Sequence, residues 1–172
     1  MEENISRERA VGEVRGMAEQ FAELYFAFVR ALREELGEAR AMEVVQRVLY
    51  VRASERAEKM IARAEAEGIA RTPENITCAS DVPYLGWDAS LGRDHCPYGK
   101  AWNARIAEFP WFRPFARLYC DVTDTTIAEV FTGNHTHQLY ENVVLGDDRC
   151  ARRYDPDPDV ARGKRTYAPK GE

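Results

Sequence analysis

The sequence predicts an α+β protein in which two long N-terminal antiparallel helices pack beside a small antiparallel sheet with shorter helices. Two neighbouring segments in the first half repeat apolar residues at steps of three and four, and a glycine follows each. This pattern is typical of amphipathic helices that end at a left-handed residue. Nearer the C-terminus, two extended segments flank a turn-like stretch, which predicts a β-hairpin.

The length of the chain suits a single domain. A chain of 172 residues can form a real core, because roughly 70% of the unfolded surface is buried on folding at this size. Its 45% hydrophobic and 31% charged residues are ordinary for a globular protein. We assign residues 1–155 to one domain and residues 156–172 to a polar C-terminal tail, mobile or loosely packed.

Charge and hydropathy disfavour two classes of partner. The net charge of -5 and the pI near 5.4 argue against nucleic acid, which binds basic surfaces. No apolar run approaches the roughly 20 residues that cross a bilayer, and the acidic start Met1-Glu2-Glu3 is unlike a signal peptide. We therefore expect a cytoplasmic protein with no membrane partner and with reduced thiols at its four widely spaced cysteines.

The two long helices are predicted over residues 6–35 and 38–67, ended by Gly37 and Gly68. Their charged outer faces indicate a solvated surface, and homodimerisation through these helices is the alternative interpretation. After them, prolines and glycines leave room only for short strands at 76–80 and 84–87.

A third helix is predicted over residues 97–108, since proline suits the first turn and Pro110 stops the helix. The aromatic run after it is interpreted as core. A further helix is predicted over 123–131, ended by Gly133, and the hairpin strands are expected within 135–145 and 149–154.

Cys96 is the strongest candidate for chemistry because it precedes Pro97 and thus falls at a helix N-cap. The positive end of the helix dipole, together with His95 and Arg93 nearby in sequence, favours the thiolate. A buried, inert thiol is the alternative.

Other polar groups could join this thiol. Cys120 precedes a predicted helix start, so it is either a second activated, catalytic thiol or a thiol that packs beneath that helix. Asp121 and Asp124 would open the helix and supply a general acid and base, whereas helix capping is the alternative role of Asp124. His135 and His137 alternate on a strand and so share a face, where they could bind a metal with a cysteine or carboxylate or simply be solvated.

The order of Cys96-Pro97, Tyr119-Cys120 with Asp121 and Asp124, and Gly146-Asp147-Asp148-Arg149-Cys150 resembles the L-2-amino-thiazoline-4-carboxylic acid hydrolase family of bacterial proteins. The resemblance covers residues 96–154. It implies a small α+β hydrolase that opens a cyclic amidine-like substrate containing C–N and C–S bonds, with no required cofactor.

Three functions follow from these residues. In the first, the Cys96 thiolate attacks the ring carbon, Asp121 or Asp124 assists proton transfer, and His95, Arg93, Trp102 and Tyr119 contact the small-molecule substrate. In the second, zinc held by Cys96, Cys120 and one of His95, His135 or His137 activates water. In the third, the same pocket binds a ligand or acts as a sensor without turnover.

Overall fold

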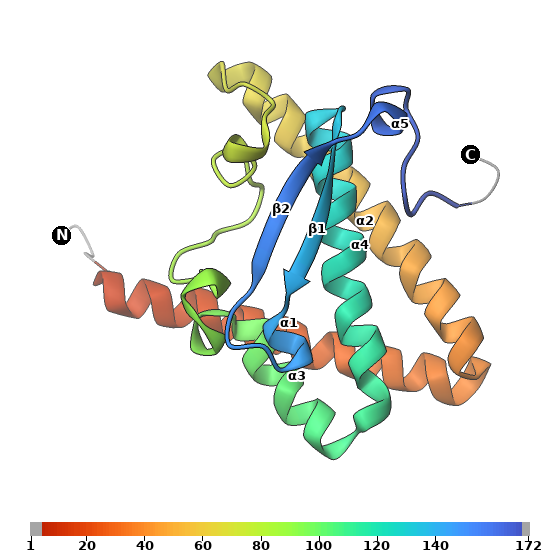
Figure 1. Cartoon of the computed structure of the whole chain (residues 1–172). Coiled ribbons are helices and arrows are strands. Elements are labelled where there is room, and N and C mark those ends of the chain that lie inside the picture. Colours follow the sequence, from red (N-terminus) through yellow and green to blue (C-terminus); the bar gives the residue numbers. More distant parts are fainter. Residues whose placement is uncertain (1–4, 170–172) are drawn as a thin grey trace.

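The computed structural model describes residues 5–169, except the side chains of Ala89 and Arg93. Helix α1 (Arg7–Leu36) and helix α2 (Glu38–Glu67) confirm the two long helices. Gly37, with a φ of 77°, forms the corner between them, and a side chain would be strained there. The helices run in opposite directions and diverge from this corner as a V (Figure 1).

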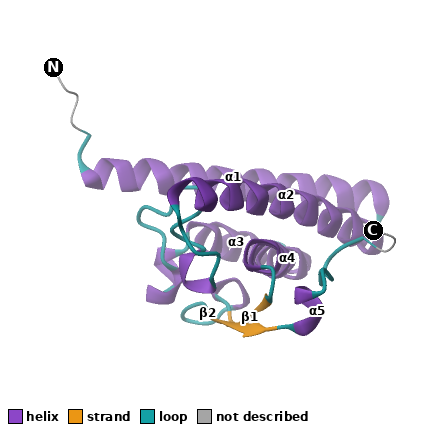
Figure 2. Ribbon diagram, turned by 90° about the horizontal axis from the view of Figure 1, so that it is seen from above, coloured by secondary structure: helices purple, strands orange, loops and turns teal. Residues whose placement is uncertain are grey.

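Three layers build the molecule (Figure 2). The first layer is α1 and α2, and the second is α3 (Pro97–Glu108) on α1 and α4 (Arg113–Thr132) on α2. Alanines on the inner face of α2 let α4 approach closely, because they add little width between the backbones; they are Ala53, Ala57 and Ala64. The third layer is a two-stranded antiparallel sheet that packs on α4.

The fold class and the helix over 97–108 are confirmed, whereas α4 begins ten residues earlier than the predicted position 123. Pro110 ends α3, but Pro114 falls in the first turn of α4, where proline is favoured. The aromatic run therefore links the two helices, and Phe112 and Phe115 are buried in the core as expected. Asp124 consequently lies in the middle of α4, so its predicted place in the first helical turn is wrong.

The predicted hairpin is confirmed, with strands β1 (His135–Glu141) and β2 (Ala151–Pro156) and His137 opposite Tyr154. Its connection spans residues 142–150 and includes the short 3₁₀ turn Val143–Leu145, so it is wider than a tight turn. No helix in the described part of the chain is long and apolar enough to span a membrane.

The two strands predicted at 76–80 and 84–87 are wrong. That part of the chain contains only short 3₁₀ turns at Pro73–Asn75, Ala89–Leu91 and Arg93–His95. It lies against α1 instead of pairing with a strand: Arg15 Nη1 donates to the carbonyl oxygen of Gly86 at 3.3 Å. A Cβ on Gly86 would overlap with the side chain of Val11, so this close approach requires glycine.

The polar tail was expected to be mobile or loosely packed. Over its described residues it contacts α4 through Thr166 and β1 through the short helix that follows β2. Asp157 caps the short helix α5 (Pro158–Ala161), and Val160 is buried. Further on, the Thr166 N–H donates to the carboxylate of the fully buried Glu129 at 2.9 Å. A buried carboxylate needs such donors, so the tail completes the core. Residues 170–172 lie outside the described residues.

Candidate functional site

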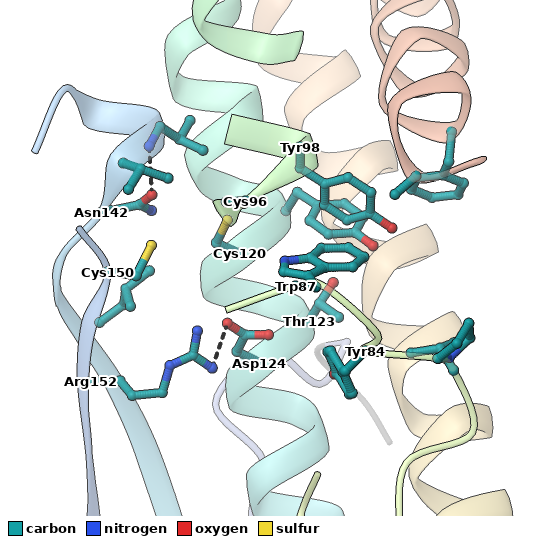
Figure 3. A pocket seen from close by; sticks show the side chains of 18 of the residues that line it. Tyr84, Trp87, Cys96, Tyr98, Cys120, Thr123, Asp124, Asn142, Cys150 and Arg152 are labelled. Carbon is teal, nitrogen blue, oxygen red and sulfur yellow. Dashed lines mark hydrogen bonds and ion pairs between the residues drawn. The ribbon is translucent and has the colours of Figure 1, made fainter. Parts of the chain in front are cut away.

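A cavity of about 300 Å³ lies between the first layer, α4, the start of α3 and the hairpin connection. Figure 3 shows side chains from all of these segments pointing toward one space. A volume of this size suits a small ligand. Its non-aromatic polar and thiol-bearing lining residues are Arg56, Cys96, Cys120, Thr123, Asp124, Asn142, Cys150 and Arg152.

Aromatic rings form one wall of this cavity. Tyr98 is central, with its ring centroid 4.5 Å from that of Trp87, 5.4 Å from that of Tyr119 and 5.5 Å from that of Phe21. Tyr119 was predicted to contact the substrate and does line the cavity. Trp102 does not: it is fully buried behind Tyr98, and its Nε1 donates to the carbonyl oxygen of Ala22 at 3.0 Å.

Cys96 is the N-cap of α3, as predicted, and its Sγ accepts a hydrogen bond from the Gly99 N–H at 3.3 Å. Its predicted ionisation is wrong. Burial raises the pKa of the Cys96 thiol to about 11, although the Gly99 N–H acts in the opposite direction. Desolvation exceeds the effect of the helix end because the thiol is nine-tenths buried. Cys96 is therefore a neutral thiol at pH 7.

The other two cysteines of the cavity are also neutral. Burial raises the pKa of Cys120 well above its ordinary value, and the neighbouring Asp124 carboxylate raises it further. Burial likewise raises the pKa of Cys150. The cavity is thus lined by three uncharged thiols, while Cys78 is exposed elsewhere.

Two ion pairs supply the charges around the cavity. Arg152 Nη1 lies 3.4 Å from Asp124 Oδ2, and this carboxylate raises the pKa of Arg152 further above its usual range. Arg56 Nε donates to Asp81 Oδ1 at 2.9 Å. Arg56 is only 9% exposed, and its Nη2 has no hydrogen-bond partner within the described residues.

Sequence reasoning missed Arg56, although a signal was present. It falls on the buried stripe of α2 between Ala53 and Met60, where an arginine is unusual because a buried charge must be paired or bind something. A charged side chain within an otherwise apolar helical stripe is the sequence signal that identifies Arg56.

Several predicted residues lie outside the cavity. Asp121 forms an ion pair with Arg117 at 2.9 Å and does not join Asp124 as a carboxylate pair at the cavity. His95 is exposed and is not part of the lining. The side chain of Arg93 lies outside the described residues.

The two strand histidines do not reach the cavity either. The ring of His135 contacts Asn134 Oδ1 at 2.7 Å, and the buried ring of His137 packs on Tyr154 with centroids 5.3 Å apart. Burial lowers the pKa of His137, so its ring is neutral at pH 7. Among the residues that the structure describes, no three His, Cys, Asp or Glu side chains form a group that could hold a metal ion.

A second cavity of about 610 Å³ adjoins the first. The two share Tyr84, Trp87, Asp124, Cys150 and Arg152. The Asp124–Arg152 ion pair therefore borders both spaces.

Comparisons with protein-family models, curated proteins and solved structures give no match. The hydrolase resemblance is thus neither supported nor refuted by them.

Proposed function

We propose that the protein binds a small, flat carboxylate in the 300 Å³ cavity. The observation that carries this proposal is the buried Nη2 of Arg56, which finds no hydrogen-bond partner over the described residues 5–169. A desolvated guanidinium N–H without an acceptor is unfavourable, and a carboxylate is the acceptor that best matches the guanidinium fork.

Asn142 supports the same ligand chemistry. Its Oδ1 accepts the Val144 N–H at 2.9 Å, which fixes the amide so that Nδ2 is a donor, and Nδ2 also has no partner among the described residues. The two unpartnered nitrogens of the lining are both donors. A ligand with acceptor oxygens would satisfy them, whereas a cationic ligand would not.

The aromatic wall supports a planar ligand body. The rings of Tyr98, Tyr119 and Trp87 are held by mutual edge contacts, so they present a surface that does not have to be ordered on binding. Aromatic side chains bind flat groups by stacking or edge contacts.

The test uses 2-amino-thiazoline-4-carboxylate and its neutral carboxamide as matched probes in isothermal titration calorimetry. The carboxylate should bind roughly 10- to 150-fold more tightly, the equivalent of one hydrogen bond to a charged group. Equal affinities, or no binding of either probe together with no binding of benzoate, would overturn the proposal. Arg56→Lys keeps the charge beside Asp81 but loses the fork, so it should reduce this selectivity without unfolding the protein.

Hydrolysis is the second candidate, because Cys96, Cys120 and Asp124 line the same cavity. In this reaction Cys96 Sγ bonds to the electrophilic ring carbon, and its proton passes through Asp124 to the departing ring atom as the C–N or C–S bond breaks. Water then releases the covalent intermediate and restores the thiol. A neutral thiol makes this step slow unless the substrate lowers the pKa of Cys96.

Product formation separates the two candidates. Incubation of the wild type with 2-amino-thiazoline-4-carboxylate, followed by mass spectrometry, should give ring-opened product only if hydrolysis occurs. In that case Cys96→Ser should keep the affinity and lose turnover. Activity that disappears on exhaustive chelation and returns with zinc would favour the zinc hydrolase instead.

A further inference from the structure

We propose that the ligand of this cavity is a carboxylic acid with a neutral carbonyl acceptor, a ketone or an amide, at its far end. Its carboxylate would bind Arg56 and its carbonyl oxygen would bind Asn142. This inference rests on the proposed function and names the ligand class of the same site more closely. It is carried by two buried nitrogens, Arg56 Nη2 and Asn142 Nδ2, which have no hydrogen-bond partner within the described chain.

Both nitrogens are held in place at the cavity. Arg56 is 9% exposed and Asn142 is 3% exposed, and both line the space. Arg56 Nε donates to Asp81 Oδ1 at 2.9 Å, and Asn142 Oδ1 accepts the Val144 N–H at 2.9 Å. Neither side chain can turn away without losing this contact. An acceptor on the ligand therefore offsets a desolvation cost that each donor otherwise bears.

The two donors come from opposite sides of the cavity. Arg56 lies on α2 in the first layer, whereas Asn142 begins the connection between the two strands of the third layer. Figure 2 shows these layers on opposite sides of α3 and α4. In Figure 3, Cys96 and Cys120 lie between Asn142 and Trp87. The two oxygens of one carboxylate share a single carbon, so one such group does not reach both sides. The ligand therefore carries two separate acceptor groups.

The two ends of the cavity differ in charge. Arg56 offers a guanidinium, whereas Asn142 offers a neutral amide, and Asp147 Oδ2 accepts the Asn142 backbone N–H at 2.7 Å. Arg152, the second arginine of the lining, lies 3.4 Å from the Asp124 carboxylate, with which it is paired. A second carboxylate at the Asn142 end would be desolvated beside the negative charge of Asp147, which is costly. A neutral carbonyl oxygen is the acceptor that fits there.

The middle of the cavity suits an uncharged, planar body. The thiols of Cys96 and Cys120 are neutral, and the ring centroids of Trp87 and Tyr98 lie 4.5 Å apart in an edge contact. Neutral thiols and aromatic rings favour an apolar, flat linker between the two polar ends. The ligand class is therefore an aromatic or conjugated keto acid, or its amide analogue.

The experiment compares acids of matched shape by isothermal titration calorimetry on the full chain. The probes are benzoate and its 3- and 4-substituted acetyl and isopropenyl derivatives. Acetyl and isopropenyl groups have nearly the same shape, but only the acetyl group has an acceptor oxygen, and the two ring positions sample two spans. For at least one position, the acetyl compound should bind roughly 5- to 150-fold more tightly, the effect of leaving a buried donor unpaired.

The outcomes separate this inference from the proposed function. Equal affinities of the acetyl and isopropenyl compounds at both positions, with benzoate bound, would overturn the inference and leave the proposed function intact. No binding of any of these acids would overturn both. Tighter binding of terephthalate than of 4-acetylbenzoate would show that the second end takes a charge, which also refutes the inference.

Variants assign each end to its residue. Asn142→Ser removes Nδ2 but keeps an oxygen that can cap the Val144 N–H, so it should remove the preference for acetyl and keep the preference for carboxylate over carboxamide. Arg56→Lys should do the reverse. Asn103→Ser is the matched control, because Asn103 Nδ2 donates to the Val143 carbonyl oxygen at 2.8 Å outside the lining, and both preferences should persist. If Asn142→Ser and Arg56→Lys reduced the same preference, the two donors would bind one group and the inference would be wrong. Circular dichroism checks that each variant is folded.

Discussion

The ionisation of Cys96 can be measured by alkylation of the native protein. Its pKa is raised from 9.0 to about 11 by burial. Because each step of one in pKa changes the thiolate fraction tenfold, the fraction at pH 7 is about 100-fold lower than that of an ordinary cysteine. Limited access to the buried Sγ slows the reaction further, so the 100-fold factor is a minimum.

Iodoacetamide labelling followed by mass mapping reports this rate for each cysteine. Cys78 is exposed and serves as the internal control. At pH 7 it should be labelled at least 100-fold faster than Cys96, and the rate at Cys96 should still be rising at pH 10. If Cys96 reacts faster than Cys78 near neutral pH, the argument that burial exceeds the helix-end effect is wrong.

Three further predictions concern stability. Thr166→Val removes a donor from the buried Glu129 carboxylate and should lower the free energy of unfolding by about 1.5–3 kcal/mol, measured by urea denaturation. Gly86→Ala places a Cβ against Val11 at a φ of +72° and should lower it by about 1–3 kcal/mol while displacing the loop that carries Trp87. The raised pKa of Cys96 contributes stability that is fully present below pH 9 and lost as the pH rises toward 11, at most about 3 kcal/mol. Cys96→Ala should make the alkaline loss smaller by this amount in pH-dependent denaturation, while the part due to the buried Cys120 and Cys150 remains.

Each of these has a matched comparison. Gly12→Ala adds a Cβ with nothing within 4 Å and should stabilise α1 by about 0.5–1 kcal/mol, opposite in sign to Gly86→Ala. Substitution of an exposed tail residue such as Arg162 by Ala should change stability by about 0.5 kcal/mol or less. Cys78→Ala should leave the alkaline loss unchanged. If Gly86→Ala were neutral, the loop would not be held closely against α1.

The long helices and the N-cap at Cys96 could be predicted because their causes are local. Gly37 and Gly68 end helices because glycine adopts a positive φ without strain. Pro97 begins α3 because proline lacks the N–H that would be unpaired in the first helical turn. The aromatic run before position 123 was interpreted only as core packing, so the start of α4 was missed, although Pro114 is a helix-start signal.

The candidate site residues also divide into a part that local sequence predicts and a part that it does not. Sequence position placed Cys96, Cys120 and Asp124 near helices, and all three line the cavity. Sequence position also predicted Asp121 and His137 as partners for these residues. In the structure, Asp121 instead pairs with Arg117, and His137 packs on Tyr154. Strand and helix periodicity determines which face of an element a residue occupies, but not which other element covers that face.

The sequence by itself determined the helical layers, the hairpin and the position of a thiol at a helix end, since these depend on neighbouring residues. Only the tertiary structure decided that this thiol is neutral, that one nitrogen of Arg56 at the cavity has no partner in the described part of the chain, and that the tail supplies donors to Glu129. Burial and pairing depend on segments distant in the chain, and desolvation is large enough to reverse what the local helix end favours.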